Sequence, residues 1–174
     1  MQKGVGGFKG DIEITKQMIE IDLARQRLSL KDGDNILMDV RVSTARNGGG
    51  EQNGSECTPR GRHVIHQKIG DGCDINTVFV SRKPTGELYT PALAEKHPGR
   101  DWILTRILWL SGAEEGVNKS GDVDTLQRYI YIHGCPDDVT MGMPGSHGCI
   151  RVRNHDMIRL FDLVGVGTPV LIKE

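Results

Sequence analysis

The tripeptide His-Gly-Cys occurs twice in this sequence, at residues 133–135 and at residues 147–149. Two histidines and two cysteines could together bind a metal ion. Alternatively, one cysteine could act as a nucleophile and one histidine as its base. The spacing and the surroundings of these side chains distinguish the two kinds of chemistry.

The zinc alternative is the weaker of the two. Structural zinc sites usually take their ligands in pairs on tight turns. Here each pair is spaced i,i+2, and the first pair follows the strongly β-forming run "RYIYI" and leads directly into Pro136. An extended strand places both side chains of such a pair on one face, so ligation stays open. Because no other clustered ligands support a site, we expect no metal and no cofactor.

Cys149 is better suited than Cys135 to act as a nucleophile. A cysteine attacks as the thiolate, which requires a base or positive surroundings. Cys149 lies two residues from both His147 and Arg151, and Gly148 before it permits a tight turn. Adjacent backbone amides at Gly148 and Cys149 could also bind an oxyanion, as acyl transfer requires.

The residue types alone leave the identity of the base open. His147 is nearer in sequence, but a spacing of i,i+2 does not ensure the right angle of its ring. His133 is expected at the end of a strand, from which its ring could reach a cysteine on a neighbouring strand. We expect one of these histidines to be catalytic and the other to be structural.

The elements that must position these residues are mostly β-strands. Alternation and β-rich composition predict strands at residues 19–24, 26–30, 36–42, 62–67, 76–81, 102–110, 128–134 and 168–174. One helix is predicted from Asn154, as a capping residue, to Val164, with Gly165 and Gly167 ending it. A weaker helical turn is predicted at residues 91–96. The fold class is therefore mainly β, a sandwich or barrel of antiparallel or mixed sheets with one or two short helices.

Length and charge exclude several classes of function. The 174 residues carry a net charge of −1, which is typical of one soluble domain that does not attract nucleic acid. No apolar run approaches the roughly 20 residues of a membrane-spanning helix, so no membrane insertion is expected. Residues 1–17 lack the apolar core of a secretion signal. We interpret them as a natural extension or an expression remnant, and residues 18–174 as the domain.

The stretch around Cys149 resembles the signature of the L,D-transpeptidase catalytic domain, also called the YkuD domain. The likeness lies in "HG" at residues 133–134 followed by "SHGCIRV" at residues 146–152. The runs "IEIDLARQRLSL", "CTPRGRHVI", "LTRILWLSG" and "LFDLVGVGTPVLI" extend it over residues 18–172. One departure is Cys135, since similar proteins often have threonine there. Its thiol could form an inhibitory disulfide with Cys149, but a silent buried cysteine is the favoured interpretation.

The resemblance implies a YkuD-type β-sandwich of mixed sheets and a cysteine enzyme acting on peptidoglycan stem peptides. Cys149 would attack the carbonyl of the third stem residue, typically meso-diaminopimelate, and expel the terminal D-alanine. His133 would be the base, oriented by the carbonyl of Gly134. Amides of Gly148 and Cys149, with His147 nearby, would stabilise the oxyanion.

Further residues are expected to shape the cleft and contact the substrate. By the resemblance, Ser146 and Arg151 would shape the site, and Arg151 could bind a substrate carboxylate or form a structural ion pair. Tyr89 and Arg106 are additional candidate substrate contacts. The long glycine-rich segment at residues 43–61 is expected to be a functional loop or a disordered excursion. This loop and the segment at residues 83–101 are expected to border the cleft.

The second half of the reaction would decide the name of the enzyme. Attack by water on the thioester makes an L,D-carboxypeptidase, and attack by an amine makes an L,D-transpeptidase. The missing export signal and the four cysteines favour a cytoplasmic L,D-carboxypeptidase that trims tetrapeptides to tripeptides in wall recycling. The alternative is a periplasmic transpeptidase whose signal was removed. A zinc-binding protein or a non-catalytic peptidoglycan-binding module is more distant.

The expected partners follow from the same resemblance. They are tetrapeptide stems or muropeptides, and carbapenem-type β-lactams are the expected inhibitors.

Overall fold

The computed structural model describes residues 16–174, and residues 1–15 of the expected N-terminal extension lie outside the described part. The strands are β1 (Gln17–Asp22), β2 (Arg27–Asp32), β3 (Asn35–Arg41), β4 (Gly61–Ile69), β5 (Thr77–Val80), β6 (Lys83–Leu88), β7 (Ile103–Gly112), β8 (Tyr131–Cys135), β9 (Ile150–Arg153) and β10 (Pro169–Lys173). The helices are α1 (Pro91–Lys96), the short 3-10 helix η1 (Gly121–Val123) and α2 (Asn154–Leu163).

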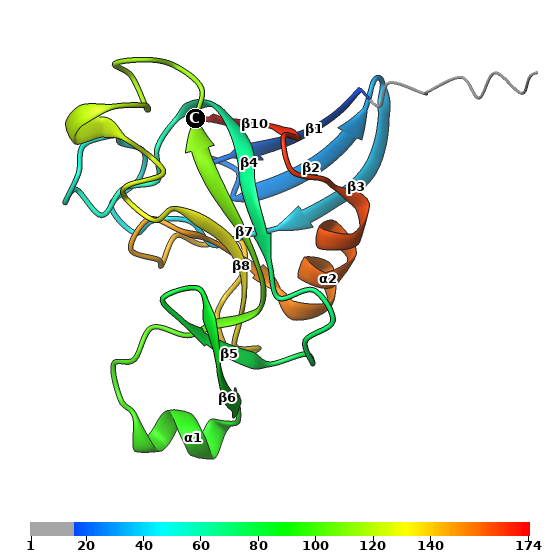
Figure 1. Cartoon of the computed structure of the whole chain (residues 1–174), viewed down its shortest axis with the longest axis vertical. Coiled ribbons are helices and arrows are strands. Elements are labelled where there is room, and N and C mark those ends of the chain that lie inside the picture. The colour runs from blue at the N-terminus through cyan, green and yellow to red at the C-terminus, as the bar shows by residue number, and fades with distance from the viewer. Residues whose placement is uncertain (1–15) are drawn as a thin grey trace, which may run out of the picture.

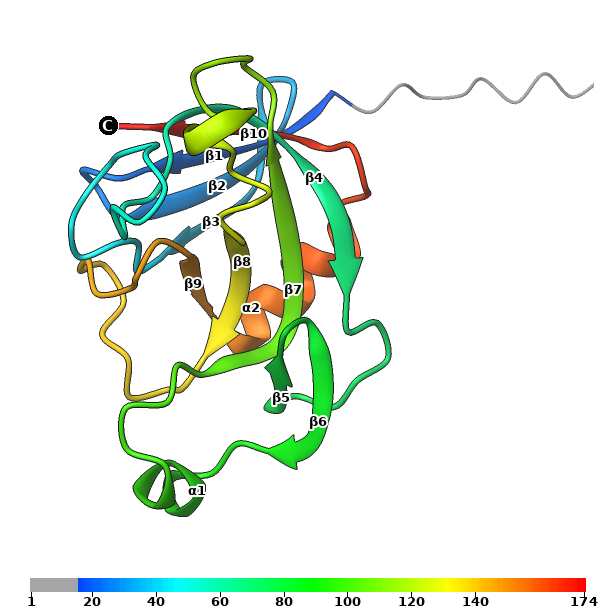
Figure 2. The ribbon, with the colours of Figure 1, turned by 60° about the vertical axis from the view of Figure 1, so that its left-hand side comes forward.

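The strands form one continuous mixed sheet that curls on itself (Figure 1). Its order is β3-β2-β1-β10-β4-β7-β5-β6, and β8 and β9 branch from β7. The pairs β1·β10 and β8·β9 are parallel, and the other pairs are antiparallel. Figure 2 shows β7, β8 and β9 next to one another, with the β5–β6 hairpin and α1 at the far end of the molecule. The predicted mainly β class with one or two short α-helices is confirmed. The layers of the predicted sandwich are parts of one continuous sheet that curls on itself.

Period-two alternation explains why the first and last strands meet in the core. Ile19 pairs with Val170 and Ile21 with Ile172, and all four side chains are buried. Alternating apolar side chains on a strand share one face, and that face is buried here. The strand that closes the chain therefore completes the sheet that the first strand begins.

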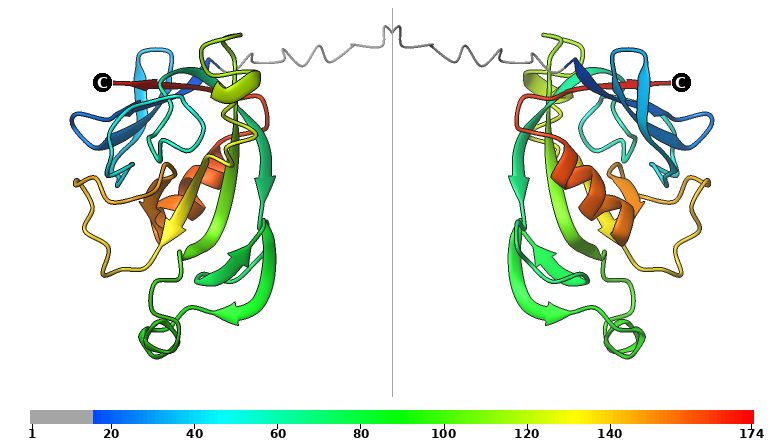
Figure 3. Two further views of the ribbon diagram at one scale, coloured as in Figure 1. Left: turned by 90° about the vertical axis from the view of Figure 1, so that its left-hand side faces the viewer. Right: turned by 90° about the vertical axis from the view of Figure 1, so that its right-hand side faces the viewer.

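Helix α2 packs against β7, β8 and β9 and closes one side of the core (Figure 3). Its buried residues Met157, Leu160 and Phe161 form the predicted apolar face. Lys68 on β4 donates from Nζ to the carbonyls of Phe161 and Val164, at 2.7 Å each. These bonds satisfy carbonyls at the helix end and place a positive charge where the helix dipole favours one.

The capping role predicted for Asn154 is wrong. The N-cap position is Arg153, which makes no side-chain capping bond. Asn154 is instead buried and donates from Nδ2 to the carbonyl of Cys135 at 3.1 Å and to Asn76 Oδ1 at 3.0 Å. Its Oδ1 accepts from Thr105 Oγ1 at 2.7 Å. The amide thus ties α2 to β8 and to β7.

Several boundaries differ from the predicted ones. The strand predicted at residues 128–134 begins only at Tyr131, because the preceding residues turn through a positive φ of 55° at Tyr129. Strands β6 and β9 had no clear alternation and were not predicted. The turn predicted at residues 91–96 is α1, and Thr90 Oγ1 caps it by accepting from the amide of Leu93 at 3.1 Å.

Within residues 16–174, no helix is long and apolar enough to span a bilayer.

Candidate active site

A cavity of about 440 Å³ opens beside β8 and the start of β9. Five residues of the predicted site contribute to its walls: His133, Ser146, His147, Cys149 and Arg151. The cavity therefore brings together the two segments that carry the repeated tripeptide.

The parallel pairing of β8 and β9 explains how His133 and Cys149 come to share this cavity. His133 is opposite Arg151 in the ladder, so Cys149 lies two residues before the partner of His133. Cys149 lies in the turn immediately before β9. The register therefore brings this turn close to β8, and the side chains of His133 and Cys149 both line the cavity.

The imidazole of His133 is held in one orientation by its own strand. Its Nδ1 lies 2.6 Å from the carbonyl oxygen of Gly134. A carbonyl only accepts hydrogen bonds, so Nδ1 carries the proton and Nε2 has a free lone pair. Burial of the ring lowers the pKa of His133. The imidazole is therefore neutral at pH 7 and able to take up a proton at Nε2.

Position 134 has room only for glycine. A Cβ there would collide with Asn154 Oδ1 and lie 2.6 Å from the carbonyl oxygen of Leu104. The buried amide of Asn154 fills the space that a side chain would need. The backbone carbonyl that orients His133 is thus fixed by close packing from behind.

The sulfur of Cys149 lies against the backbone at the start of β8 and just before it. The amide of Tyr131 donates to Sγ at 3.3 Å, and the thiol donates to the carbonyl of Tyr129 at 3.5 Å. Burial raises the pKa of Cys149 to about 12, while the hydrogen bond from Tyr131 opposes that rise. Both shifts favour a neutral thiol and a neutral imidazole in the resting site, so a base must remove the thiol proton before the sulfur can attack.

A short turn at residues 146–149 presents the cysteine. Ser146 Oγ accepts from the amide of Gly148 at 3.2 Å and donates to the carbonyl of Cys149 at 2.5 Å. Gly148 has a φ of 132°, and a Cβ there would lie 3.1 Å from Ile130 Cδ1. Thr58 Oγ1 holds the carbonyl of Gly148 at 2.9 Å from the other side.

This turn changes two of the predicted roles. The amide of Gly148, expected to bind the oxyanion, donates to Ser146 instead. The hydroxyl of Ser146, expected to serve the substrate, is occupied on both sides by the backbone of the turn. Ser146 therefore fixes the turn that carries Cys149, and the amide of Cys149 is the remaining backbone candidate for the oxyanion.

Arg151 and His147 lie at the rim of the cavity, each close to a carboxylate. Arg151 Nη2 is 3.2 Å from Asp101 Oδ1, and its Nη1 donates to the carbonyl of Gly145 at 3.2 Å. His147 Nδ1 lies 3.4 Å from Glu56 Oε2, with both side chains largely exposed. Of the two roles expected for Arg151, the structure has the ion pair, which is made with Asp101. The side chain of Arg151 also lines the cavity.

The substrate contact predicted for Arg106 is wrong. Its side chain is buried away from the cavity and donates from Nη1 to the carbonyls of Cys73 at 2.7 Å and Thr105 at 2.6 Å. The guanidinium carbon also lies 5.6 Å from the centre of the Phe161 ring. The register of β7 shifts between Leu104 and Ile107, and this bulge turns Arg106 toward α2.

Tyr89 lies in a different cavity from Cys149. Its ring meets Trp102 edge-on with centroids 5.1 Å apart, and both residues line a second cavity of about 270 Å³. Asp101 and Arg151 line both cavities. The segment at residues 83–101 therefore borders the cleft as expected, with Tyr89 in the adjoining cavity.

The glycine-rich loop before β4 supports the site from behind and does not line the main cavity. Arg128, which does line it, donates to the carbonyls of Gly50, Glu51 and Cys57 at 3.1, 2.9 and 2.7 Å. Thr58 connects the same loop to the nucleophile turn. The loop is held in place by these bonds, and it reaches the cleft at the rim, where Glu56 lies beside His147.

Cys135 is remote from Cys149. It is fully buried, and burial raises the pKa of its thiol to about 11. Its ladder partner is Arg153, four residues beyond Cys149, which corresponds to about 13 Å along the strand. A disulfide needs Cα atoms about 4.4–6.8 Å apart, so the folded protein cannot join these two cysteines.

The repeated tripeptide does not assemble a metal site. Across residues 16–174, no three side chains of histidine, cysteine, aspartate or glutamate converge on a common point.

The sequence reasoning did not name eight of the residues that line the main cavity, among them Arg82, Asp101, Arg128 and Tyr131. Tyr131 had a usable signal, because it lies two residues before His133 and so shares its face of the strand. The other three come from loops and turns, and no local pattern marks them.

The fold and the cavity together define a class of protein. A neutral, oriented imidazole and a cysteine thiol in one cavity are the parts of a cysteine acyl-transfer site, here on a curled mixed β-sheet. The family is shown by comparison: the model of the L,D-transpeptidase catalytic domain (YkuD) matches residues 16–172. The chain belongs to this family.

Curated relatives and solved structures agree with that membership. A probable L,D-transpeptidase ErfK/SrfK of Salmonella typhimurium is 31% identical over 102 residues, which cover 52% of this chain and 33% of that protein. The chain thus spans about a third of the length of this relative. L,D-transpeptidase 3 from Mycobacterium tuberculosis has a TM-score of 0.57 at 14% identity, covering 92% of this chain and 62% of the other. LdtMt1 in complex with imipenem has a TM-score of 0.56 at 18% identity, covering 91% and 59%. These two structures show the shared fold.

Proposed function

We propose that this protein is a cysteine enzyme that cleaves the bond between the third residue and the terminal D-alanine of peptidoglycan tetrapeptide stems, with water as the acceptor. The observation that carries the proposal is the pairing of His133 and Cys149 in one cavity, with Nδ1 of His133 bonded to Gly134. Membership of the L,D-transpeptidase catalytic domain family supports the choice of substrate.

The neutral resting state determines the order of the proton transfers. The thiol of Cys149 first leaves its contact with the carbonyl of Tyr129 and turns toward Nε2 of His133. Nε2 takes the proton as the sulfur attacks the stem carbonyl, and the imidazolium then protonates the departing amine of D-alanine. The carbonyl of Gly134 accepts from Nδ1 throughout and favours the charged ring.

The tetrahedral intermediate needs hydrogen-bond donors directed at its oxyanion. The amide of Gly148 is occupied by Ser146, so we assign the amide of Cys149 as the backbone donor. His147 is exposed at the same rim and can approach from the solvent side. Water then attacks the thioester with His133 as base, which releases the tripeptide and restores the thiol.

The experiment uses a disaccharide tetrapeptide, with and without an added D-amino acid, and identifies the products by mass. We expect D-alanine and a tripeptide from the wild-type protein and no product from Cys149→Ala. Cys73→Ala is the matched control, because Cys73 is a half-buried thiol outside the main cavity. Undiminished turnover by Cys149→Ala would contradict the proposal.

Transfer to an amine is the second candidate function. The second cavity adjoins the first at Asp101 and Arg151, and this arrangement offers space for an acceptor next to the thioester. An enzyme of this kind would be a periplasmic L,D-transpeptidase that crosslinks stems or exchanges D-amino acids. In the experiment above, a tetrapeptide carrying the added D-residue would establish transfer, and tripeptide alone would establish hydrolysis.

The proposal extends to inhibition and to location. LdtMt1 was solved in complex with imipenem, and we propose that carbapenems acylate Cys149 of this protein. Intact-protein mass after incubation with imipenem tests this, with Cys149→Ala as the unmodified control. A cytoplasmic location is also proposed, and the four free cysteines are compatible with a reducing compartment. Fractionation of the native host with an antibody to the chain tests it.

A further inference from the structure

The tip of the β5–β6 hairpin directs a charged side chain into the main cavity. The turn between these strands is Ser81-Arg82, and Arg82 lines the cavity together with Cys149. Both turn residues have positive φ, 49° and 65°. Two-residue hairpin turns of this kind favour Asn-Gly or Asp-Gly, because other residues are strained there. Strain of this kind is concentrated at functional sites in proteins.

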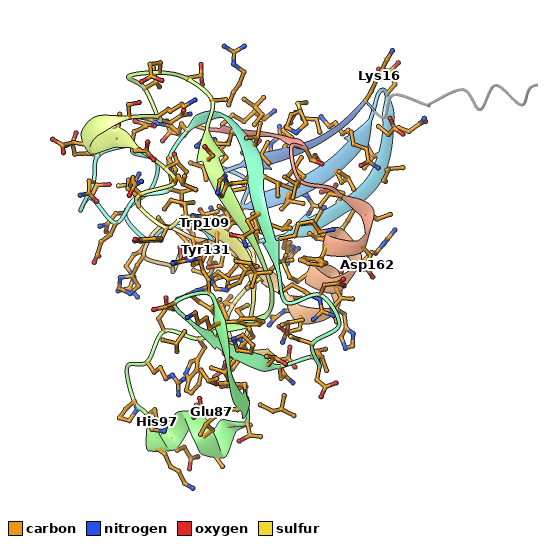
Figure 4. All side chains as sticks on the ribbon, in the orientation of Figure 1. Lys16, Glu87, His97, Trp109, Tyr131 and Asp162 are labelled. Carbon is orange, nitrogen blue, oxygen red and sulfur yellow. The ribbon has the colours of Figure 1, made fainter. Side chains whose placement is uncertain are left out.

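The guanidinium of Arg82 is held by aromatic rings. Its central carbon lies 4.6 Å from the centre of the Trp109 ring and 4.8 Å from that of Tyr129. Its Nη1 donates to the hydroxyl of Tyr131 at 3.0 Å. Figure 4 shows Trp109 and Tyr131 next to each other in the middle of the molecule, above the β5–β6 hairpin.

Most N–H groups of the Arg82 guanidinium make no hydrogen bond within residues 16–174. Arginine has five N–H groups, and within residues 16–174 only Nη1 of Arg82 meets an acceptor, the hydroxyl of Tyr131. No carboxylate of the described chain forms an ion pair with it. Arg100 and Arg151, which also border the two cavities, each have an acidic partner. Arg82 is thus a fixed cation on the cavity wall whose remaining N–H groups suit a carboxylate.

The side chain of Tyr131 sets the distance between this cation and the nucleophile. Its amide contacts Cys149 Sγ at 3.3 Å, and its hydroxyl contacts Arg82 at 3.0 Å. A tyrosine measures about 7 Å from amide to hydroxyl, so the sulfur and the guanidinium lie at opposite ends of a side chain of that length. The distal carboxylate of diaminopimelate, six bonds or about 7.5 Å from the scissile carbon, matches this length. The carboxylate of the terminal D-alanine, three bonds or about 4 Å from the same carbon, is shorter than it.

We propose that Arg82, oriented by the Tyr131 hydroxyl, binds the distal carboxylate of the third stem residue and makes the site selective for stems in which that carboxylate is free. This inference rests on the proposed function and assigns Arg82 as a specificity-determining residue of that site. A stem in which the distal carboxylate is amidated loses the charge-assisted bond and is a poor substrate.

The test compares two tetrapeptides that differ only in a free or amidated distal carboxylate, and the measured quantity is kcat/KM for D-alanine release. The wild-type protein should prefer the free acid by roughly 10- to 100-fold. Arg82→Gln should bring this ratio close to one, chiefly by slowing the free acid. Arg82→Lys should keep part of the preference, because it retains the charge and loses the fork. Arg25→Gln, an exposed arginine on the β1–β2 turn, is the matched control and should keep the full ratio.

Binding to the Cys149→Ala protein gives a second readout that needs no turnover. Calorimetry should show the free acid binding at least about tenfold tighter than the amide, and adding Arg82→Gln should remove the difference. Selective binding without turnover by the wild-type protein would refute the proposed function and leave this inference standing. An unchanged acid-to-amide ratio in a folded Arg82→Gln protein would overturn it. If the preference of the protein instead depends on whether the second stem residue is amidated, the assignment of Arg82 to the distal carboxylate of the third residue is wrong.

Discussion

Replacing Asn154 by aspartate distinguishes between two roles of this side chain, that of a helix cap and that of a member of a buried hydrogen-bond network. As a cap, aspartate is as good as asparagine, so the substitution would leave stability unchanged. In the structure, Nδ2 of Asn154 donates to the carbonyl of Cys135 and to Asn76 Oδ1. Both partners are oxygens, and a carbonyl cannot donate, so an aspartate oxygen there would face acceptors only. Each buried acceptor left without a donor costs about 1–3 kcal/mol, so we expect a loss of about 2–6 kcal/mol.

The free energy of unfolding from urea titration at pH 7 measures this loss, with the slope m compared between variants. Thr90 supplies the matched control, because its Oγ1 is a genuine helix cap that accepts from the Leu93 amide. Thr90→Asp keeps an acceptor and should stay within about 0.5 kcal/mol of wild type, whereas Thr90→Ala should lose about 1 kcal/mol. If Asn154→Asp is as stable as Thr90→Asp, the network does not hold α2 to β8 and our reasoning is refuted.

Three further predictions concern acid stability and the nucleophile turn. Burial lowers the pKa of His63 to about 4, so its contribution to stability is complete above about pH 6.5 and is lost as the pH falls toward 4, by up to about 3 kcal/mol. His63→Gln should flatten that part of the curve of unfolding free energy against pH, and equal slopes in both proteins would contradict this. Gly148→Ala should lower D-alanine release at least about tenfold by straining a φ of 132° and crowding Ile130; unchanged kcat would disprove the need for glycine. Thr58→Val removes bonds to the carbonyl of Gly148 and from the amide of Ala45 and should cost about 1–3 kcal/mol in urea titration, while Thr58→Ser should restore most of it.

Most of the secondary structure could be predicted because it depends on local chemistry. The alternating Ile19 and Ile21 predict β1 by the period of a strand, and Met157 with Phe161 predicts α2 by the period of a helix. The likeness of residues 146–152 to a family signature pointed to Cys149 before any geometry was known. These signals lie within a few residues of one another, so the linear order of the chain is enough to show them.

The tertiary structure decided what each polar side chain contacts. Asn154 has the residue type of a cap and Arg106 that of a substrate contact, yet both are buried in backbone networks. Arg82 carries no local signal, and only the pairing of the β5–β6 hairpin with β7 brings it into the cavity that Cys149 also lines. Composition and spacing determine which residues can form strands and helices. Which strands pair, and where a bulge turns a side chain, depends on contacts between residues far apart in sequence, and these exist only in the folded chain.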